Sequence, residues 1–241
     1  MMNNYIEIYS VISGSKAYGT DNENSDTDLR CIAFPDFESM FGLDPFITRV
    51  VKDPDITIYS FNKFVSLALN ANPNILELLW IEEPKNVLVE TYYSKRLKQI
   101  RGEFLSKKAF TSYFGYAKAQ LHKIKNEGNC SAEMNSKRKA SIDLNGYDVK
   151  AAMHLMRLLY QLGAIEMEGC IPMPLTGHRL NMCLEIRNGK VPFDLFKEYA
   201  EAEFNYLETL EAGSKMRSEP DYKKIKSFVV EMNRLFYVER I

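Results

Sequence analysis

The chain has 241 residues, of which 46% are hydrophobic and 26% are charged, and its formal net charge is −1. This is an ordinary globular composition, with enough material for one large domain or two small ones. The near balance of charges gives no overall sign of nucleic-acid binding, although it leaves room for a local basic patch. We expect a cytoplasmic protein without a membrane partner, because neither a signal peptide nor a bilayer-length apolar run is recognisable.

The first third of the chain carries strand patterns. Alternating apolar residues predict strands over residues 5–13, 28–34 and 55–60. Residues 35–54 hold three prolines and mixed polarity, which predicts a loop with one short helix. From residue 61 the spacing becomes helical, and the segment 70–74 interrupts it before a further helix that ends near residue 80.

The rest of the chain has helical patterns. Residues 92–125 carry helical periodicity with a break at Gly102, and residues 126–147 have the polar composition of a mobile loop. Amphipathic spacing predicts three further helices, over residues 148–167, 193–212 and 220–238. We therefore expect an α+β protein with a small mixed-sheet domain, residues 1–85, followed by an all-helical domain, residues 86–241.

Two acidic residues mark the start of the second predicted strand. Asp26 and Asp28 are two positions apart, so in extended backbone their side chains would share a face. Two convergent carboxylates need a positive charge between them, and a hard divalent cation with oxygen ligands meets that need.

A Gly-Ser bend ends the first predicted strand. Gly14 and Ser15 would offer backbone N–H groups to phosphate at the start of a short helical segment, and Gly19 would allow a tight turn after it. Arg30 lies in phase with Asp26 and Asp28, so it could reach a phosphate or pair with a carboxylate.

The motif G-S-x-x-x-G…S-D-x-D, from Gly14 to Asp28, closely resembles the signature of the DNA polymerase beta-like nucleotidyltransferase superfamily. This resemblance implies a palm-like mixed-sheet catalytic domain and a two-ion site for Mg²⁺ or Mn²⁺. It also implies a third carboxylate on a neighbouring strand beside Asp26 and Asp28. Asp55 begins a predicted strand and is our preferred candidate, with Asp53 as the competitor.

The same resemblance suggests nucleotide-binding residues around the motif. Gly14 and Ser15 would hold the β- and γ-phosphates, and Ser25 would either cap the turn before Asp26 or contact the ligand. The full set expected near the nucleotide in this part of the chain is Gly14, Ser15, Lys16, Gly19, Ser25 and Arg30.

Later blocks resemble the RNA-ligase-associated (YcgL-like) predicted nucleotidyltransferases, some of which are phage-encoded. These blocks are Asp55 with residues 59–64, then residues 72–79 and 146–159, with a weaker match at 186–189 and 220–221. Within residues 146–159, Lys150, His154 and Arg157 share one face of the predicted helix, which could hold a triphosphate or an RNA phosphate. A solvated helix face is the alternative reading of that stripe.

We therefore expect a metal-dependent nucleotidyltransferase that moves a nucleoside monophosphate from an NTP to a hydroxyl acceptor and releases pyrophosphate. An RNA or tRNA end is the preferred acceptor, and a protein or small-molecule hydroxyl is the alternative. A nucleotide- or RNA-binding module without turnover is a hypothesis of another class. The base of the NTP, the acceptor and the oligomeric state stay open.

Overall fold

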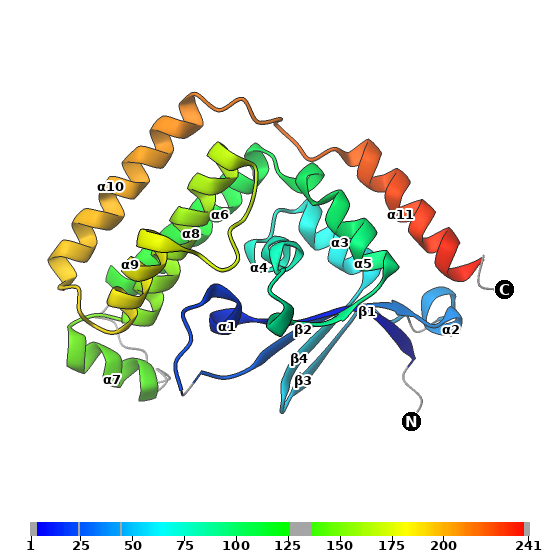
Figure 1. Ribbon diagram of the computed structural model, residues 1–241, viewed down its shortest axis with the longest axis horizontal. Helices are drawn as coiled ribbons and strands as arrows, with labels where there is room; N and C mark the ends of the chain where they lie inside the picture. Colours follow the sequence, from blue (N-terminus) through cyan, green and yellow to red (C-terminus); the bar gives the residue numbers. More distant parts are fainter. Residues whose placement is uncertain (1–3, 24, 44, 126–135, 239–241) are drawn as a thin grey trace. The chain divides into compact units, whose positions relative to one another are not determined.

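The computed structural model describes residues 4–23, 25–43, 45–125 and 136–238 (Figure 1). The contacts of the chain divide it into two compact units. The first consists of Met1–Ala109 and Arg217–Ile241, and the second of Phe110–Met216. Among the described residues, none of the helices combines the length and the apolar character that crossing a bilayer requires.

The first unit is built on a five-stranded mixed sheet with the strand order β3-β4-β2-β1-β5. Its strands are β1 Tyr5–Ser13, β2 Asp28–Pro35, β3 Thr48–Lys52, β4 Asp55–Ser60 and β5 Val87–Glu90. The β2–β4 pair is parallel, whereas the other three pairs are antiparallel. Because parallel strands start at the same edge of a sheet, the first residues of β2 and β4 are neighbours.

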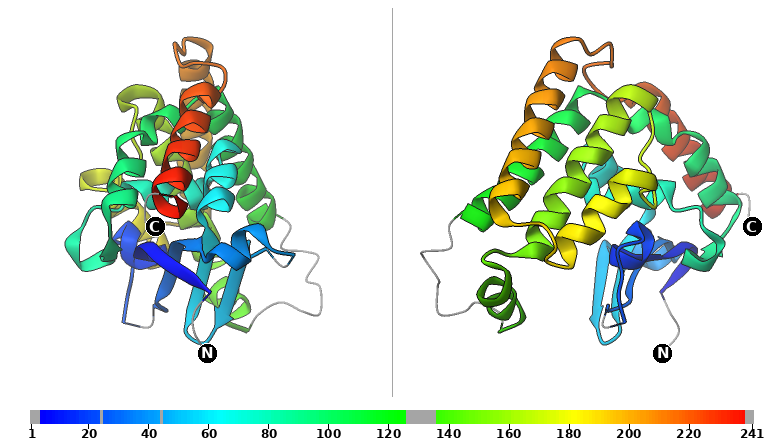
Figure 2. Two further views of the ribbon diagram at one scale, coloured as in Figure 1. Left: turned by 90° about the vertical axis from the view of Figure 1, so that its right-hand side faces the viewer. Right: turned by 60° about the vertical axis from the view of Figure 1, so that its left-hand side comes forward.

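Short helices and the last long helix accompany this sheet (Figures 1 and 2). They are α1 Gly14–Tyr18, α2 Phe37–Phe41, α3 Phe61–Leu69, α4 Pro73–Leu76, η1 Glu77–Trp80, η2 Pro84–Asn86, α5 Tyr92–Gln99, η3 Arg101–Phe104 and α11 Tyr222–Tyr237. The helix α6 (Lys107–Lys125) starts in the first unit and continues into the second. The second unit also contains α7 Ser136–Asn145, α8 Val149–Glu168, α9 Gly177–Arg187 and α10 Phe193–Ala212.

An aromatic cluster on one face of the sheet fixes the helices of the first unit. The buried ring of Phe34 on β2 lies 4.7 Å from Phe61 of α3, 5.2 Å from Tyr93 of α5 and 4.2 Å from Phe236 of α11. Figure 1 shows these three helices on the same side of the sheet. Burying large aromatic rings is a major source of stability, so this cluster ties the C-terminal helix α11 to the N-terminal sheet.

Several predicted elements are confirmed. The strands β1 and β4 and the helix α10 have the expected bounds. Asn72 caps α4 by accepting a hydrogen bond from the Asn74 backbone N–H at 3.1 Å, and Pro73 occupies the first turn. The break near Gly102 is also present, because η3 separates α5 from α6.

Other predictions were wrong or incomplete. The segment 35–54 contains the strand β3 besides one short helix, and β5 and α9 were not predicted at all. The supposed loop 126–147 includes the helix α7, while its residues 126–135 lie outside the described part of the chain. Both missed strands lie at the edges of the sheet, where only one flank is paired.

The compact units also differ from the expected pair of domains. The helices α5 and α11 belong to the sheet unit, because their aromatic side chains pack on Phe34. The sequence analysis assigned both helices to the helical domain. The division into a catalytic domain, residues 1–85, and a helical domain, residues 86–241, stays a prediction. Expressing the two ranges separately and measuring whether each folds would test it.

Candidate functional site

The Gly-Ser bend joins β1 to the five-residue helix α1. Gly14 has φ +66°, a left-handed conformation that glycine adopts without a Cβ penalty. The helix ends at Gly19, which is also left-handed at φ +72°. The Thr20 backbone N–H then donates to the Ser15 carbonyl at 2.9 Å, which closes the turn. Both glycines of the predicted motif thus occupy positions where other residues would be strained.

Asp28 lies directly against this bend. Ser13 and Asp28 are paired across β1 and β2, and the Ser13 hydroxyl donates to the Asp28 carbonyl at 3.2 Å. A Cβ placed on Gly14 would be only 2.2 Å from Oδ2 of Asp28. The absence of a side chain at Gly14 therefore allows the Asp28 carboxylate to approach the backbone that the sequence analysis assigned to phosphate binding.

Asp55 lies beside Asp28, with Arg30 between them. The parallel register pairs Leu29 with Ile56, so Asp28 and Asp55 are the adjacent first residues of β2 and β4. The Arg30 guanidinium is 3.3 Å from Oδ1 of Asp55 through Nη1 and 3.9 Å from Oδ1 of Asp28 through Nη2. Asp53, the alternative third carboxylate, precedes β4 in the turn after β3.

The remaining polar residues of the motif order the segment before β2. Asp26 is exposed and precedes the strand. The Lys16 ammonium donates to the Thr27 hydroxyl, which ties α1 to this segment. Ser25 closes a turn with Asn22, because its hydroxyl accepts from the Asn22 backbone N–H at 2.9 Å. The contacts of Ser25 are those of the turn-capping residue that was one of its two predicted roles.

Carboxylate oxygens are suitable ligands for Mg²⁺ or Mn²⁺, so the donor chemistry of Asp26, Asp28 and Asp55 fits the expected cations. Asp28 and Asp55 already share one cationic partner, Arg30. Within the described ranges, however, no three acidic, histidine or cysteine side chains are grouped closely enough to hold a metal ion. Two of the three predicted carboxylates, Asp28 and Asp55, therefore pair with one positive charge, and the three do not form a single metal-binding group among the described residues.

A buried hydrogen bond connects α1 to η1. The Tyr18 hydroxyl donates to Oε1 of Glu77, and both side chains are almost fully buried. Ionised carboxylates are costly to bury without hydrogen-bonding partners. The contact therefore fixes the end of the motif helix to the following part of the same unit. Neither Tyr18 nor Glu77 is among the predicted site residues, and no local pattern pairs two residues this far apart.

The predicted basic stripe on α8 lies in the second unit and is only partly exposed. Lys150 is exposed, whereas Arg157 and Gln161 are 3% and 0% exposed. The Arg157 guanidinium donates to Oε1 of Gln161 at 2.8 Å, and Gln161 in turn contacts Met173. The stripe is thus a solvated face at its first turn and a buried polar network further along.

His154, between these positions, is uncharged at neutral pH. Burial, followed by the positive charges of Arg157, Lys150, Arg187 and Lys123, lowers the pKa of its imidazole to about 3. Arg187 on α9 and Lys123 on α6 therefore belong to the same basic cluster. Arg187 lies in the weak family match at residues 186–189, which was the signal that could have identified it, whereas no such signal marks Lys123.

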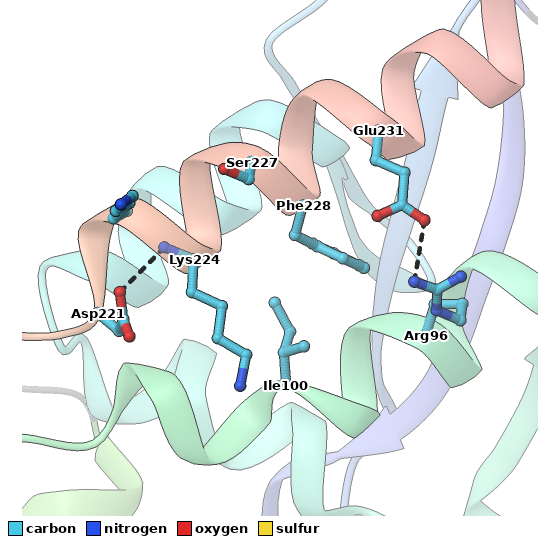
Figure 3. A pocket seen from close by; sticks show the side chains of 8 residues that line it. Arg96, Ile100, Asp221, Lys224, Ser227, Phe228 and Glu231 are labelled. Carbon is cyan, nitrogen blue, oxygen red and sulfur yellow. Dashed lines mark hydrogen bonds and ion pairs between the residues drawn. The ribbon is translucent and has the colours of Figure 1, made fainter.

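The first unit has a separate open pocket of about 460 Å³ between α5 and α11 (Figure 3). Ile100 and Phe228 lie between an ion pair of Arg96 with Glu231, 2.9 Å, and the Lys224 side chain. Lys224 pairs in turn with Glu103. None of the residues predicted for the nucleotide or the metal lines this pocket, so it is not part of the candidate site.

The sheet topology, the glycine bend and the paired acidic residues are those of a polymerase beta-like nucleotidyltransferase. Consistent with this class, the model of the RNA repair pathway DNA polymerase beta family matches residues 3–231, which is nearly the whole chain. The chain therefore belongs to this family, and the recognised superfamily is confirmed.

The chain was also compared with solved structures and with curated proteins. The solved structure of a nucleotidyltransferase-like protein from Exiguobacterium sibiricum 255-15 is 13% identical, with a TM-score of 0.36. The similarity covers 97% of this chain and 75% of that one, and nothing about the fold or function is concluded from it. None of the curated proteins compared with the chain matches it.

Proposed function

We propose that the protein transfers a nucleoside monophosphate from an NTP to a hydroxyl group on RNA and releases pyrophosphate. In this reaction the acceptor oxygen forms a bond to the α-phosphorus, the bond from that phosphorus to the pyrophosphate oxygen breaks, and the acceptor hydroxyl loses its proton. The observation that carries the proposal is the contact of the Asp28 carboxylate with the Gly14 bend, in a chain of the polymerase beta family.

The residues of the first unit supply the parts that this reaction needs. The backbone N–H groups and hydroxyl at Gly14 and Ser15 would bind the triphosphate tail. Asp28 and Asp55, with Asp26, would hold Mg²⁺ or Mn²⁺. When bound, such an ion supplies charge neutralisation for the phosphates and the reacting oxygens. The protein's own contribution is to orient the phosphate chain beside these carboxylates.

RNA is the preferred acceptor for two reasons. The description of the family to which the chain belongs refers to an RNA repair pathway. The second unit also carries Lys123, Lys150 and Arg187 in the cluster around His154. Arginine and lysine side chains of this kind bind phosphate, either in the NTP tail or in an RNA backbone.

The test is incubation of the protein with each of the four NTPs, labelled at the α-phosphate, in the presence of Mg²⁺ or Mn²⁺. Total RNA and a total protein fraction serve as separate acceptors. We expect label on RNA, pyrophosphate release, and loss of both in Asp26→Ala/Asp28→Ala. Label that appears only on protein would contradict the RNA acceptor, and transfer that persists in the double variant would remove the assignment.

A matched pair of variants tests the third carboxylate. We expect Asp55→Asn to lower the transfer rate by about a hundredfold or more, because it removes a carboxylate beside Asp28. Asp53→Asn, two residues earlier in the turn before β4, should keep at least half of the rate. The reverse order of the two rates would assign the role to Asp53. NTP binding without pyrophosphate release in the unaltered protein would favour a binding module.

A further inference from the structure

Arg30 has the geometry of a counter-charge for the two carboxylates at the starts of β2 and β4. Its side chain is 23% exposed, so it is more buried than those of Asp28 at 31% and Asp55 at 47%. A hydrogen bond from Nη1 to the Leu29 carbonyl at 2.9 Å fixes the guanidinium against the sheet. The same Nη1 donates to Oδ1 of Asp55 at 3.3 Å, and Nη2 faces Asp28.

A positive charge is needed at this point. Asp28 and Asp55 begin adjacent parallel strands, and two carboxylates that converge repel one another unless a cation lies near both. Arg30 meets this need from the sheet itself, two residues along β2 from Asp28. Its contact with Asp55 is a direct hydrogen bond, whereas its separation of 3.9 Å from Asp28 is a looser ion pair.

We propose that Arg30 and a divalent cation compete for Asp28 and Asp55, so that Arg30 neutralises the carboxylates while no ion is bound and is displaced when an ion binds. Arg30 is then a positioning residue that keeps the site assembled between turnovers. The inference rests on the proposed function, because it takes Asp28 and Asp55 as the cation ligands. In this proposal the role of Arg30 is to neutralise carboxylates, which differs from the phosphate-binding role expected of the residues around Gly14.

Competition has a consequence opposite to that expected of an ordinary structural arginine. Removing the guanidinium should tighten cation binding, because the incoming ion no longer has to break an ion pair or share the site with a positive charge. It should also make the ion-free protein less stable, because the two carboxylates then lose the counter-charge of Arg30. An arginine that only supports the fold would weaken both properties together.

The experiment measures Mn²⁺ binding by calorimetry and by electron paramagnetic resonance, on the full chain and without nucleotide. We expect Arg30→Gln to bind Mn²⁺ roughly tenfold more tightly than the unaltered protein, as one unit charge a few ångströms away at intermediate dielectric allows. In chelator its melting temperature should be lower than that of the unaltered protein, and added Mn²⁺ should raise the melting temperature more.

Lys16→Gln is the matched control. It also removes one positive charge from the motif, but the contact of Lys16 is with the Thr27 hydroxyl and not with the two carboxylates. Its effect on Mn²⁺ affinity should be clearly smaller than that of Arg30→Gln. An equal effect would overturn the proposal, because it would mean that net charge alone sets the affinity.

Other outcomes also decide the matter. Unchanged or weaker Mn²⁺ binding in Arg30→Gln, or no Mn²⁺ binding by either protein, would overturn the competition. Should Arg30→Gln fail to fold, Arg30→Lys keeps the charge without the planar fork that reaches both carboxylates, so it should bind Mn²⁺ more tightly than the unaltered protein; equal or weaker binding would overturn the proposal. The proposed function can fail independently of this inference. In that case no nucleotidyl transfer would be detected, while the Mn²⁺ affinities of the variants would still differ as expected.

Discussion

Substitution of Gly14 by alanine gives the sharpest prediction, because the structure provides its own control. Gly14 and Gly169 both have φ +66°, and a Cβ at Gly169 would have no atom within 4 Å. Holding alanine in the left-handed region costs about 1–2 kcal/mol. Each single variant should therefore lose at least this much stability, which is a melting temperature lower by about 2–8 °C for a chain of this size.

Gly14→Ala has a second cost that Gly169→Ala lacks. Its new methyl group would lie 2.2 Å from Oδ2 of Asp28, so the carboxylate must move by roughly 1 Å to reach an ordinary contact distance. A displacement of this size in a reacting constellation costs about a hundredfold in rate. We expect Gly14→Ala to lose that factor in nucleotidyl transfer, and Gly169→Ala to keep the rate of the unaltered protein.

A double-mutant cycle with Asp28→Ala isolates the contact without an activity assay. Truncating Asp28 leaves only its Cβ, 3.6 Å from the added methyl, so Gly14→Ala should then cost no more than its backbone strain. Urea denaturation of the four proteins measures the difference. The reasoning would be refuted by equal costs of Gly14→Ala in the two backgrounds, or by a Gly14→Ala rate within twofold of the Gly169→Ala rate.

Two further predictions concern ionisable groups that are buried or partly buried. Tyr18→Phe removes a hydrogen bond to the buried Glu77 carboxylate, so it should lower the free energy of unfolding, measured in urea, by about 1–3 kcal/mol. The loss should be larger than that of Glu77→Gln, which keeps an acceptor oxygen. A Tyr18→Phe protein as stable as the unaltered one would contradict this. His154 has a pKa of about 3, below its unfolded value near 6.5, so the unfolded state binds more protons between these values and stability is lost as the pH falls through this window. His154→Asn should therefore lose less stability between about pH 7.5 and about pH 5 than the unaltered protein, and equal losses in urea midpoints would show that His154 is not the group responsible.

The elements that the sequence predicts well are those whose signal is local. The strands β1 and β4 and the helix α10 have apolar periodicity that marks one buried face, and their bounds agree with the structure. The glycines of the motif are equally local, because a bend from a strand into a short helix requires left-handed backbone at Gly14 and Gly19. The motif could therefore be recognised before its geometry was known.

The two missed strands show where such reasoning fails. Both β3 and β5 are edge strands, and four of the five residues of β3 are exposed. An edge strand pairs along one flank only and tolerates polar side chains, so its sequence lacks a clear alternation. What makes Thr48–Lys52 a strand is its pairing with β4, which is a contact between segments and not a property of the segment itself.

The chemistry of Arg30 depends on the same kind of information. Periodicity put Arg30 on the face of Asp26 and Asp28, and it left a phosphate contact and an ion pair as equal alternatives. The parallel register of β2 with β4 supplies the ion pair, because it brings Asp55 within 3.3 Å of the guanidinium, and the phosphate contact stays a prediction. No local pattern specifies that register, since Arg30 and Asp55 are 25 residues apart in sequence and their two strands could pair in either direction.

The helix α8 makes the complementary point about amphipathic patterns. A helical wheel gives the direction of each side chain correctly, so Lys150, His154 and Arg157 do share one face. It does not say how much of that face other segments cover. Here Lys150 is exposed while Arg157 is nearly inaccessible and bonded to Gln161, so one stripe contains both a surface cation and a buried network. Substitution of Lys150 therefore tests phosphate attraction at the surface, whereas substitution of Arg157 also perturbs folding through the buried partner that it leaves behind.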